Sequence, residues 1–332
     1  MQIFINTYGT YLHVKDDMFE IKVKDKEEKK VKINHIAAHK ITSFIVSKGS
    51  AISTDAVALA LKHNIDIVVV ENDGHPMGRF WHSKLGSTTK IRKRQLEASL
   101  GEEGLEWVKQ WIMKKLENQA DYLQDLAKHR STLLPYLQHQ QDQILNYRLR
   151  IKELNGGVVQ EHADMIRAME GNSGRLYFGA LSKSIHPEFA FQGRSFRPAK
   201  DPFNAMLNYC YGILYSRVER SLMLAGLDPY VGFLHRDDYN MKSLVFDFIE
   251  PYRIYAERCV FVLFSTKKVK KSFFDEIVGG VTLNAEGKPF LVENFTKFFD
   301  VQVIRYKGRN QTRANALQLE AHQFANRLIE KL

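Results

Sequence analysis

The segment Gly86-Ser-Thr-Thr-Lys-Ile-Arg-Lys-Arg94 marks the point where the sequence changes from one pattern to another. Before it, apolar residues alternate with charged ones, as they do in β-strands. After it, apolar residues recur every three or four positions, as they do in helices. The sequence therefore predicts an α+β protein, with a small β-rich domain at residues 1–86 and a larger all-α domain at residues 87–332.

The first domain has its clearest strand pattern at residues 19–24, where Phe-Glu-Ile-Lys-Val-Lys alternates apolar and charged side chains. A run of charged residues at positions 26–30 separates this segment from Val31 and Ile33. The pattern predicts a hairpin with one buried face. Residues 65–70 are continuously apolar or nearly so, which indicates a buried strand.

The second domain shows long helical patterns at residues 102–129 and 136–151. Pro135 lies between them and cannot stand inside a helix without breaking it. We therefore expect two helices that are separated near this proline.

The composition favours a globular protein with a polyanionic partner. Of 332 residues 44% are hydrophobic, which is enough for two domains. The 48 Lys and Arg residues outnumber the 38 Asp and Glu residues. This excess indicates nucleic acid as a partner, although an ordinary basic enzyme would also fit. The two cysteines form no CxxC pair, and no long apolar run is present, so we expect a soluble cytoplasmic protein without a disulfide framework.

One imidazole and two carboxylates lie close together in GLDPYVGFLH at residues 226–235 and SLVFDFIEPYR at residues 243–253. On a helix, Asp247 and Glu250 would share a face. Clustered carboxylates repel each other unless a cation lies between them, and a histidine with carboxylates suits Mg²⁺ or Mn²⁺. The alternative is a hydrogen-bonded His235 beside a solvated acidic face. Pro251 either kinks the helix or starts a new one, which leaves Glu250 at an irregular place.

A third carboxylate, Glu170, lies in a helical pattern at residues 167–178. Gly171 and Gly174 follow it, and each costs about 1 kcal/mol relative to alanine inside a helix. Such glycines suggest that another backbone approaches closely and that Glu170 points into a shared cavity. A plain helix with a surface glutamate is the alternative.

A basic loop at residues 194–200 leads into another expected helix. Asp201 can cap this helix, and Pro202 fits its first position. Arg194, Arg197 and Lys200 then lie where a phosphate can be held by charge and by the helix N-terminus.

The motifs at residues 167–178, 194–204 and 226–253, taken together and in their order along the chain, resemble those of the CRISPR-associated integrase family. The members of this family are the integrases of spacer acquisition. The later segment GGVTLN at residues 279–284 is similar to another element of that family. The resemblance covers nearly the whole chain, since a small β domain before a helical domain is also the family's layout.

The resemblance assigns roles to residues that the patterns above had singled out. It implies that Glu170, His235 and Glu250 are ligands of a catalytic Mg²⁺ or Mn²⁺ ion and that Asp247 supports them. Basic residues near these motifs are the candidates to bind DNA phosphates: Arg194, Arg197, Lys200, Arg236, Lys242 and Arg253.

The activity implied is a metal-dependent transesterification that joins the 3′-hydroxyl ends of captured DNA to the CRISPR array. The resemblance also implies a homodimer formed through the β domains, and a heterohexameric complex with a small second CRISPR-associated protein. Two other functions remain open. A nuclease of branched DNA repair intermediates would use the same metal to activate water, and a non-catalytic scaffold would use only the basic surface.

Overall fold

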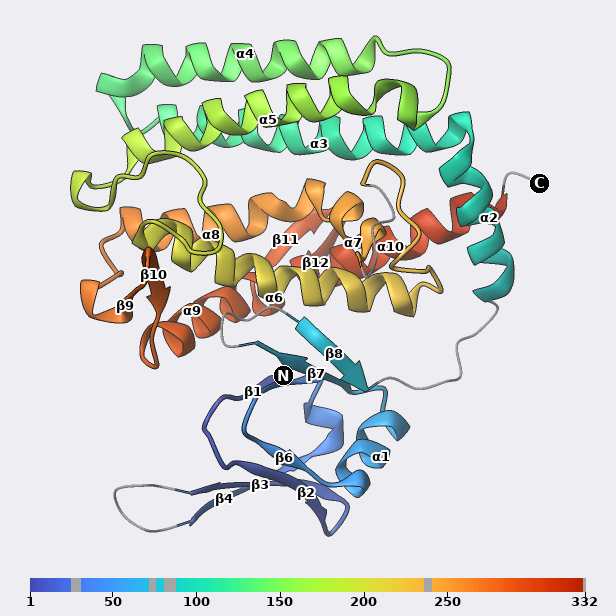
Figure 1. Ribbon diagram of the computed structural model, residues 1–332, viewed down its shortest axis with the longest axis vertical. Coiled ribbons are helices and arrows are strands. Elements are labelled where there is room, and N and C mark those ends of the chain that lie inside the picture. Colours follow the sequence, from blue (N-terminus) through green and yellow to red (C-terminus); the bar gives the residue numbers. More distant parts are fainter. Residues whose placement is uncertain (25–30, 72–75, 81–87, 236–240, 331–332) are drawn as a thin grey trace. The chain divides into compact units, whose positions relative to one another are not determined.

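The computed structural model describes residues 1–24, 31–71, 76–80, 88–235 and 241–330, and the chain divides into two compact units, Met1–Gly86 and Ser87–Leu332. The first unit is rich in strands and the second is mostly helical (Figure 1), which confirms the predicted α+β class. The expected turn at residues 26–30 and Arg236 lie outside the described residues.

In its described residues, the first unit contains two four-stranded sheets and an α-helix, α1 (Thr54–Lys62). One sheet has the strand order β1-β5-β7-β8 and the other has the order β4-β3-β2-β6. The strands are β1 Gln2–Ile5, β2 Tyr11–Lys15, β3 Met18–Lys24, β4 Val31–Ala37, β5 Ser43–Ser47, β6 Ala51–Ile52, β7 Asp66–Val70 and β8 Pro76–Phe80. Leu12, Phe19, Phe44 and Ile67 are fully buried and form the centre of this core.

The predicted hairpin is formed by β3 and β4, which pair in antiparallel fashion. Phe19 and Ile21 are buried as expected, but Val31 and Ile33 are each 49% exposed. The register explains the difference, because it places Ile33 opposite Lys22, on the face that carries the charged residues of β3. A pattern in one strand does not fix the register of the next.

Glu20 lies on that outer face and is nevertheless only 2% exposed. Its carboxylate oxygens lie 2.6 Å from His13 Nε2, 2.6 Å from His35 Nε2 and 3.0 Å from Lys22 Nζ. The hydrogen bond from Lys22, helped by those of the two histidines, outweighs the effect of burial and lowers the pKa of Glu20 to about 2.

Glu20→Gln should make the stability of the protein less dependent on pH under acid conditions. A carboxylate with a depressed pKa stabilises the folded state above its unfolded pKa of 4.5, and this contribution is lost as the pH falls towards about 2. The variant should therefore be less stable than the wild type at pH 7, and the difference should shrink between pH 4.5 and 2. Urea unfolding over this range measures it, and a difference that stayed constant would contradict the assignment.

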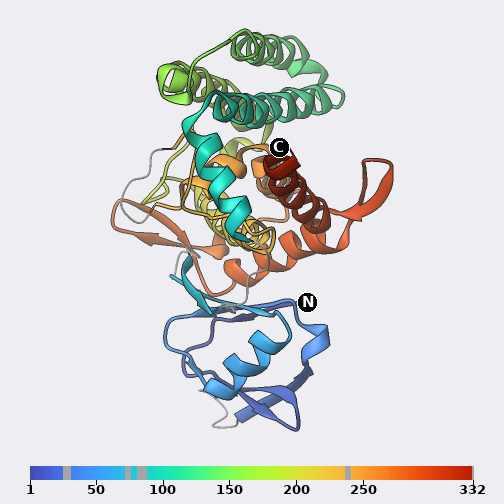
Figure 2. The same ribbon diagram turned by 90° about the vertical axis from the view of Figure 1, so that its right-hand side faces the viewer.

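The second unit is built from nine helices in its described residues, with α3, α4 and α5 running side by side (Figure 1 and Figure 2). The two helices expected around Pro135 are present, and this proline lies in the first turn of α4. None of the described helices is both long and apolar enough to cross a membrane. The helices are α2 Thr88–Leu100, α3 Glu102–Ala127, α4 Leu134–Lys152, α5 Val159–Ser184, α6 Pro202–Leu224, α7 Ser243–Phe248, α8 Arg253–Ser265, α9 Gly287–Thr296 and α10 Arg313–Glu330.

The expectation of an all-α second domain is wrong in one respect, because this unit also holds two short hairpins. They consist of β9 (Phe274–Ile277) with β10 (Gly280–Leu283), and of β11 (Val303–Tyr306) with β12 (Arg309–Thr312). Lys307 and Gly308 join the second pair, and both have positive φ angles, as two-residue hairpin turns often require. Val281 of the first hairpin bridges to Ala199, next to the basic loop.

The idea that Gly171 and Gly174 admit another backbone is also wrong. A Cβ atom added at either position would meet nothing within 4 Å. The close approach occurs at Gly232 instead, where an added Cβ would lie 2.4 Å from the Cβ of Ser243. The loop that carries His235 therefore lies directly against the first turn of α7.

An aromatic cluster holds the same two elements together. The ring of Trp111 on α3 meets Phe233 at 5.4 Å, Phe248 at 5.9 Å and Phe324 at 5.3 Å between centroids, each edge to face. Phe233 lies two residues before His235, and Phe248 directly follows Asp247. The hydrophobic core thus fixes the backbone on both sides of these polar residues.

Candidate active site

Asp247 binds the loop that carries His235, and both of its carboxylate oxygens accept hydrogen bonds from this loop. Its Oδ2 accepts hydrogen bonds from the backbone N–H groups of Phe233 (2.6 Å) and Leu234 (3.1 Å), and its Oδ1 accepts one from the N–H of His235 (3.1 Å). Oδ1 also lies 2.6 Å from Nδ1 of the His235 ring. This contact makes Nδ1 the hydrogen-bond donor and leaves Nε2 as the ring nitrogen that is directed away from Asp247.

The acidic neighbours of His235 raise its pKa. Burial by itself would lower the pKa of His235, but the hydrogen bond and the charge of Asp247 outweigh it and raise the pKa above 6.5. The charge of Glu250 adds to the same effect, which shows that Glu250 lies within electrostatic range of the ring.

Glu250 lies at a break between helices, as the presence of Pro251 led us to expect. It is the first residue of a 3₁₀ turn, η4 (Glu250–Tyr252), between α7 and α8. Its side chain is 3% exposed, and its oxygens lie 2.9 Å from Arg253 Nε and 2.6 Å from Lys115 Nζ. Burial would raise the pKa of Glu250, but the charges of Arg253 and Lys115 outweigh it and lower the pKa to about 2. Glu250 is therefore a carboxylate over the whole physiological range.

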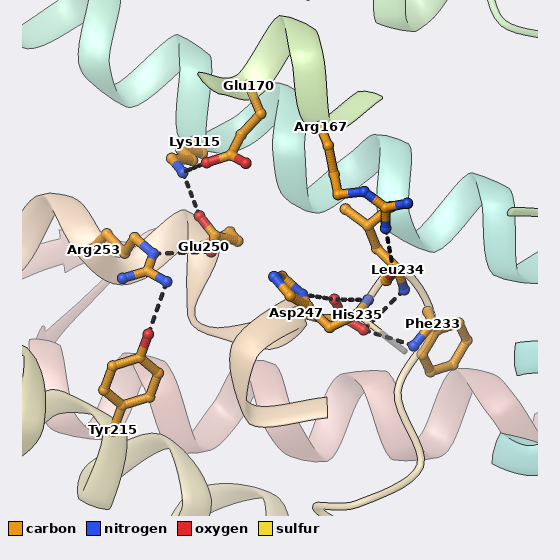
Figure 3. Close-up of polar contacts among 10 residues, drawn as sticks. All are labelled: Lys115, Arg167, Glu170, Tyr215, Phe233, Leu234, His235, Asp247, Glu250 and Arg253. Carbon is orange, nitrogen blue, oxygen red and sulfur yellow. Dashed lines mark hydrogen bonds and ion pairs between the residues drawn. The ribbon is translucent and has the colours of Figure 1, made fainter. Parts of the chain in front are cut away.

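Glu170 reaches the same place from α5. Its carboxylate forms an ion pair with the ammonium group of Lys115, so that Lys115 bridges Glu170 and Glu250 (Figure 3). The side chain of Glu170 is 29% exposed, whereas that of Lys115 is 8% exposed. The carboxylates of Glu170 on α5 and Glu250 in η4 thus come together on a buried lysine that the motifs did not indicate.

The imidazole of His235 is directed towards Glu250 (Figure 3). Within the described ranges, however, no three or more His, Cys, Asp or Glu side chains are close enough together to hold a metal ion as they stand. Lys115 and Arg253 instead neutralise the two carboxylates. A shared ion at Glu170, His235 and Glu250 stays a prediction.

With this geometry established, the comparisons with known proteins decide the family. The model of the family described as CRISPR associated protein Cas1 matches residues 3–297. The chain belongs to the Cas1 family. This confirms the resemblance that the sequence motifs indicated.

Relatives of this Cas1 chain include curated proteins and solved structures. A CRISPR-associated endonuclease Cas1 of Archaeoglobus fulgidus is 31% identical over 336 residues, covering 97% of this chain and 94% of that protein. A casposase bound to integration product has a TM-score of 0.85 at 22% identity and covers 100% of this chain and 91% of that one. A Cas1 protein from Thermotoga maritima has a TM-score of 0.81 at 19% identity, with coverages of 99% and 97%. The similarity to these two structures shows that the chain shares their fold.

The basic loop of this Cas1 chain is tied down by Arg194. Its guanidinium donates hydrogen bonds to Oδ1 of Asn204 and, at 2.6 Å, to Oδ1 of Asn208. It also lies over the rings of Phe178 and Tyr211, at 5.3 and 5.4 Å from their centroids. Arg194 therefore fastens the loop to α6, which begins as predicted with Asp201 capping the N–H of Asn204 at 2.8 Å.

The other predicted phosphate-binding residues differ in what they contact. Arg197 lies in the exposed part of the loop, over the ring of Phe196. Lys200 donates to the carbonyl of Gly279 at 2.7 Å, and Lys242 pairs with Glu219 at 2.8 Å. Arg253 donates hydrogen bonds to the carboxylate of Glu250 and to the hydroxyl of Tyr215, so its guanidinium is part of the candidate active site.

Three further polar residues that the motifs did not indicate hold this site in place. Lys115 bridges the carboxylates, Asn118 donates to the carbonyl of Pro251 at 2.8 Å, and Arg167 donates to the carbonyl of Leu234 at 3.1 Å. The signal for Lys115 was its place on the apolar face of α3, four residues from Trp111 and next to Leu116.

Proposed function

We propose that this Cas1 chain is the integrase of CRISPR adaptation, joining the 3′-hydroxyl ends of captured DNA to a phosphodiester of the CRISPR array. The observation that carries the proposal is that Glu170 and Glu250 converge on Lys115, with His235 held by Asp247 and directed towards Glu250, in a chain that belongs to the Cas1 family. The name of one structural neighbour, a casposase bound to integration product, supports the reaction type.

We propose that the site binds a divalent cation, Mg²⁺ or Mn²⁺, because carboxylates and an imidazole are ligands that such an ion accepts. Two carboxylates converge on one positive charge, and Asp247 leaves Nε2 of His235 as the ring nitrogen for an ion. Such an ion would stabilise the negative charge that develops on the scissile phosphate. Glu170, Glu250 and His235 would hold it, Asp247 would orient His235, and no covalent bond to the protein is needed.

We also propose DNA and protein partners. One solved neighbour is a chain of a Cas6-RT-Cas1–Cas2 complex, with a TM-score of 0.79 at 19% identity; the match covers 100% of this chain and 35% of that chain. That name supports a small partner of the Cas2 kind. We propose that the two proteins assemble as a heterohexamer. The exposed Val31 and Ile33 on the outer face of β4 support a homodimer formed through the first unit.

Arg197→Ala should weaken DNA binding, because it removes an exposed guanidinium from the basic loop. Each phosphate contact that is lost should reduce the slope of log affinity against log salt by about one unit. Arg194→Ala should in addition lower stability, because it removes the contacts to Asn204 and Asn208. Binding to a labelled duplex between about 50 and 200 mM salt measures the slope. An unchanged slope for Arg197→Ala would remove this residue from the interface.

A strand-transfer assay tests the proposed activity against its alternatives. It combines a DNA fragment with labelled 3′-hydroxyl ends, a supercoiled plasmid carrying an array, Mn²⁺ or Mg²⁺, and the small partner or none. We expect the label to become joined to the plasmid. Cutting without joining would favour a nuclease of branched DNA, and binding without either reaction would favour a scaffold.

A further inference from the structure

Lys115 has no part in the proposed reaction, yet it occupies the centre of the site. It projects from α3 and is 7% exposed. Its Nζ lies 2.6 Å from Oε2 of Glu250 and forms a second ion pair with Glu170 (Figure 3). One buried ammonium group therefore holds both of the carboxylates that the proposed function assigns to a divalent ion.

The charges of Glu170 and Glu250 are already balanced without an ion. Glu170 and Glu250 supply two negative charges, and Lys115 and Arg253 supply two positive ones. A divalent cation placed beside both carboxylates would lie next to two positive groups in a poorly solvated setting, where repulsion is strong. It would also need oxygen atoms that now bind the ammonium group of Lys115.

We propose that Lys115 and the divalent cation compete for Glu170 and Glu250, and that the lysine keeps the two carboxylates together until the ion displaces it. The inference rests on the proposed function, since it presupposes that an ion binds there. Without a cation, the two carboxylates would repel each other and draw apart. Lys115 thus preserves the arrangement of the site and at the same time weakens its affinity for the ion.

Binding of Mn²⁺ to the purified 332-residue chain tests this inference, with free Mn²⁺ measured by electron paramagnetic resonance. Lys115→Met removes the competing charge and keeps the length of the side chain. The variant should bind Mn²⁺ at least about tenfold more tightly than the wild type, because the ion no longer has to displace a positive charge. Its melting temperature should be lower without Mn²⁺ and should rise more when Mn²⁺ is added.

Lys109→Met is the matched control. Lys109 lies on the same helix, is 5% exposed, and donates to Glu106 at 2.8 Å and to the carbonyl of Leu154 at 2.6 Å. Its replacement should leave the affinity for Mn²⁺ unchanged. Lys115→Gln is a second variant with the same expected result, in case Lys115→Met does not fold.

The possible failures can be told apart. If the wild type binds Mn²⁺ and the folded Lys115 variants bind it equally or more weakly, the competition is overturned while the metal site stands. If neither the wild type nor the variants bind Mn²⁺, the proposed metal dependence fails and the inference fails with it.

Discussion

Glu170→Gln is expected to reduce strand joining by at least about a hundredfold while DNA binding is kept or becomes tighter. Glutamine has nearly the same shape but no charge, so it cannot hold a divalent ion as a carboxylate does. Removing a negative charge from the site also lowers the repulsion of DNA phosphates. Joining and binding should be measured side by side on the same DNA fragment.

Glu161→Gln is a suitable control for this variant, because Glu161 is an exposed glutamate in the first turn of the same helix. It should change neither joining nor binding. If Glu170→Gln lost binding and joining in equal proportion, the role of Glu170 would be structural and the assignment to the reaction would be wrong.

Asp247→Ala is expected to lower the free energy of unfolding by about 3 kcal/mol, because buried N–H groups that lose this acceptor keep the cost of their desolvation. The backbone N–H groups of residues 233–235 and the ring of His235 all bind this carboxylate. Strand joining should fall as well, since His235 would no longer be held in one orientation. Urea unfolding and the joining assay measure the two effects.

Asp228→Ala provides the comparison for Asp247→Ala. The carboxylate of Asp228 accepts one hydrogen bond, from the N–H of Tyr230 at 3.0 Å, in the same loop. Its loss should cost no more than about 1 kcal/mol. Equal losses of stability in the two variants would show that Asp247 has no special part in fixing the loop.

The parts of the fold that short sequence signals determine were predictable. Asp201 with Pro202 marked the start of α6, and Pro251 marked the interruption that sets Glu250 apart from α7 and α8. Each signal acts through the backbone of its own turn, so no distant residue can cancel it. The β11–β12 hairpin carried such a signal in Lys307-Gly308, but its strands are short enough to be taken for part of a helical region.

Contacts between residues that are far apart in the sequence could not be predicted from such local signals. Lys115 meets Glu170 and Glu250 only because α3, α5 and η4 pack together, and its own segment resembles an ordinary amphipathic helix. A lysine on the apolar face of such a helix was the available hint, because a buried lysine needs a partner. The sequence indicated Arg194 as a phosphate contact, but it did not indicate that Asn204 and Asn208 are its acceptors, because these bonds depend on how the loop folds onto α6.

Crystals grown with Mn²⁺ would show most directly whether Glu170, His235 and Glu250 form one catalytic metal site. Anomalous scattering locates the ion without reference to activity. We expect one peak bound by the carboxylates of Glu170 and Glu250 and by Nε2 of His235, with the ammonium group of Lys115 turned away from both glutamates. A peak elsewhere, or a Lys115 that still bridges the two carboxylates with no ion beside them, would contradict the proposed site.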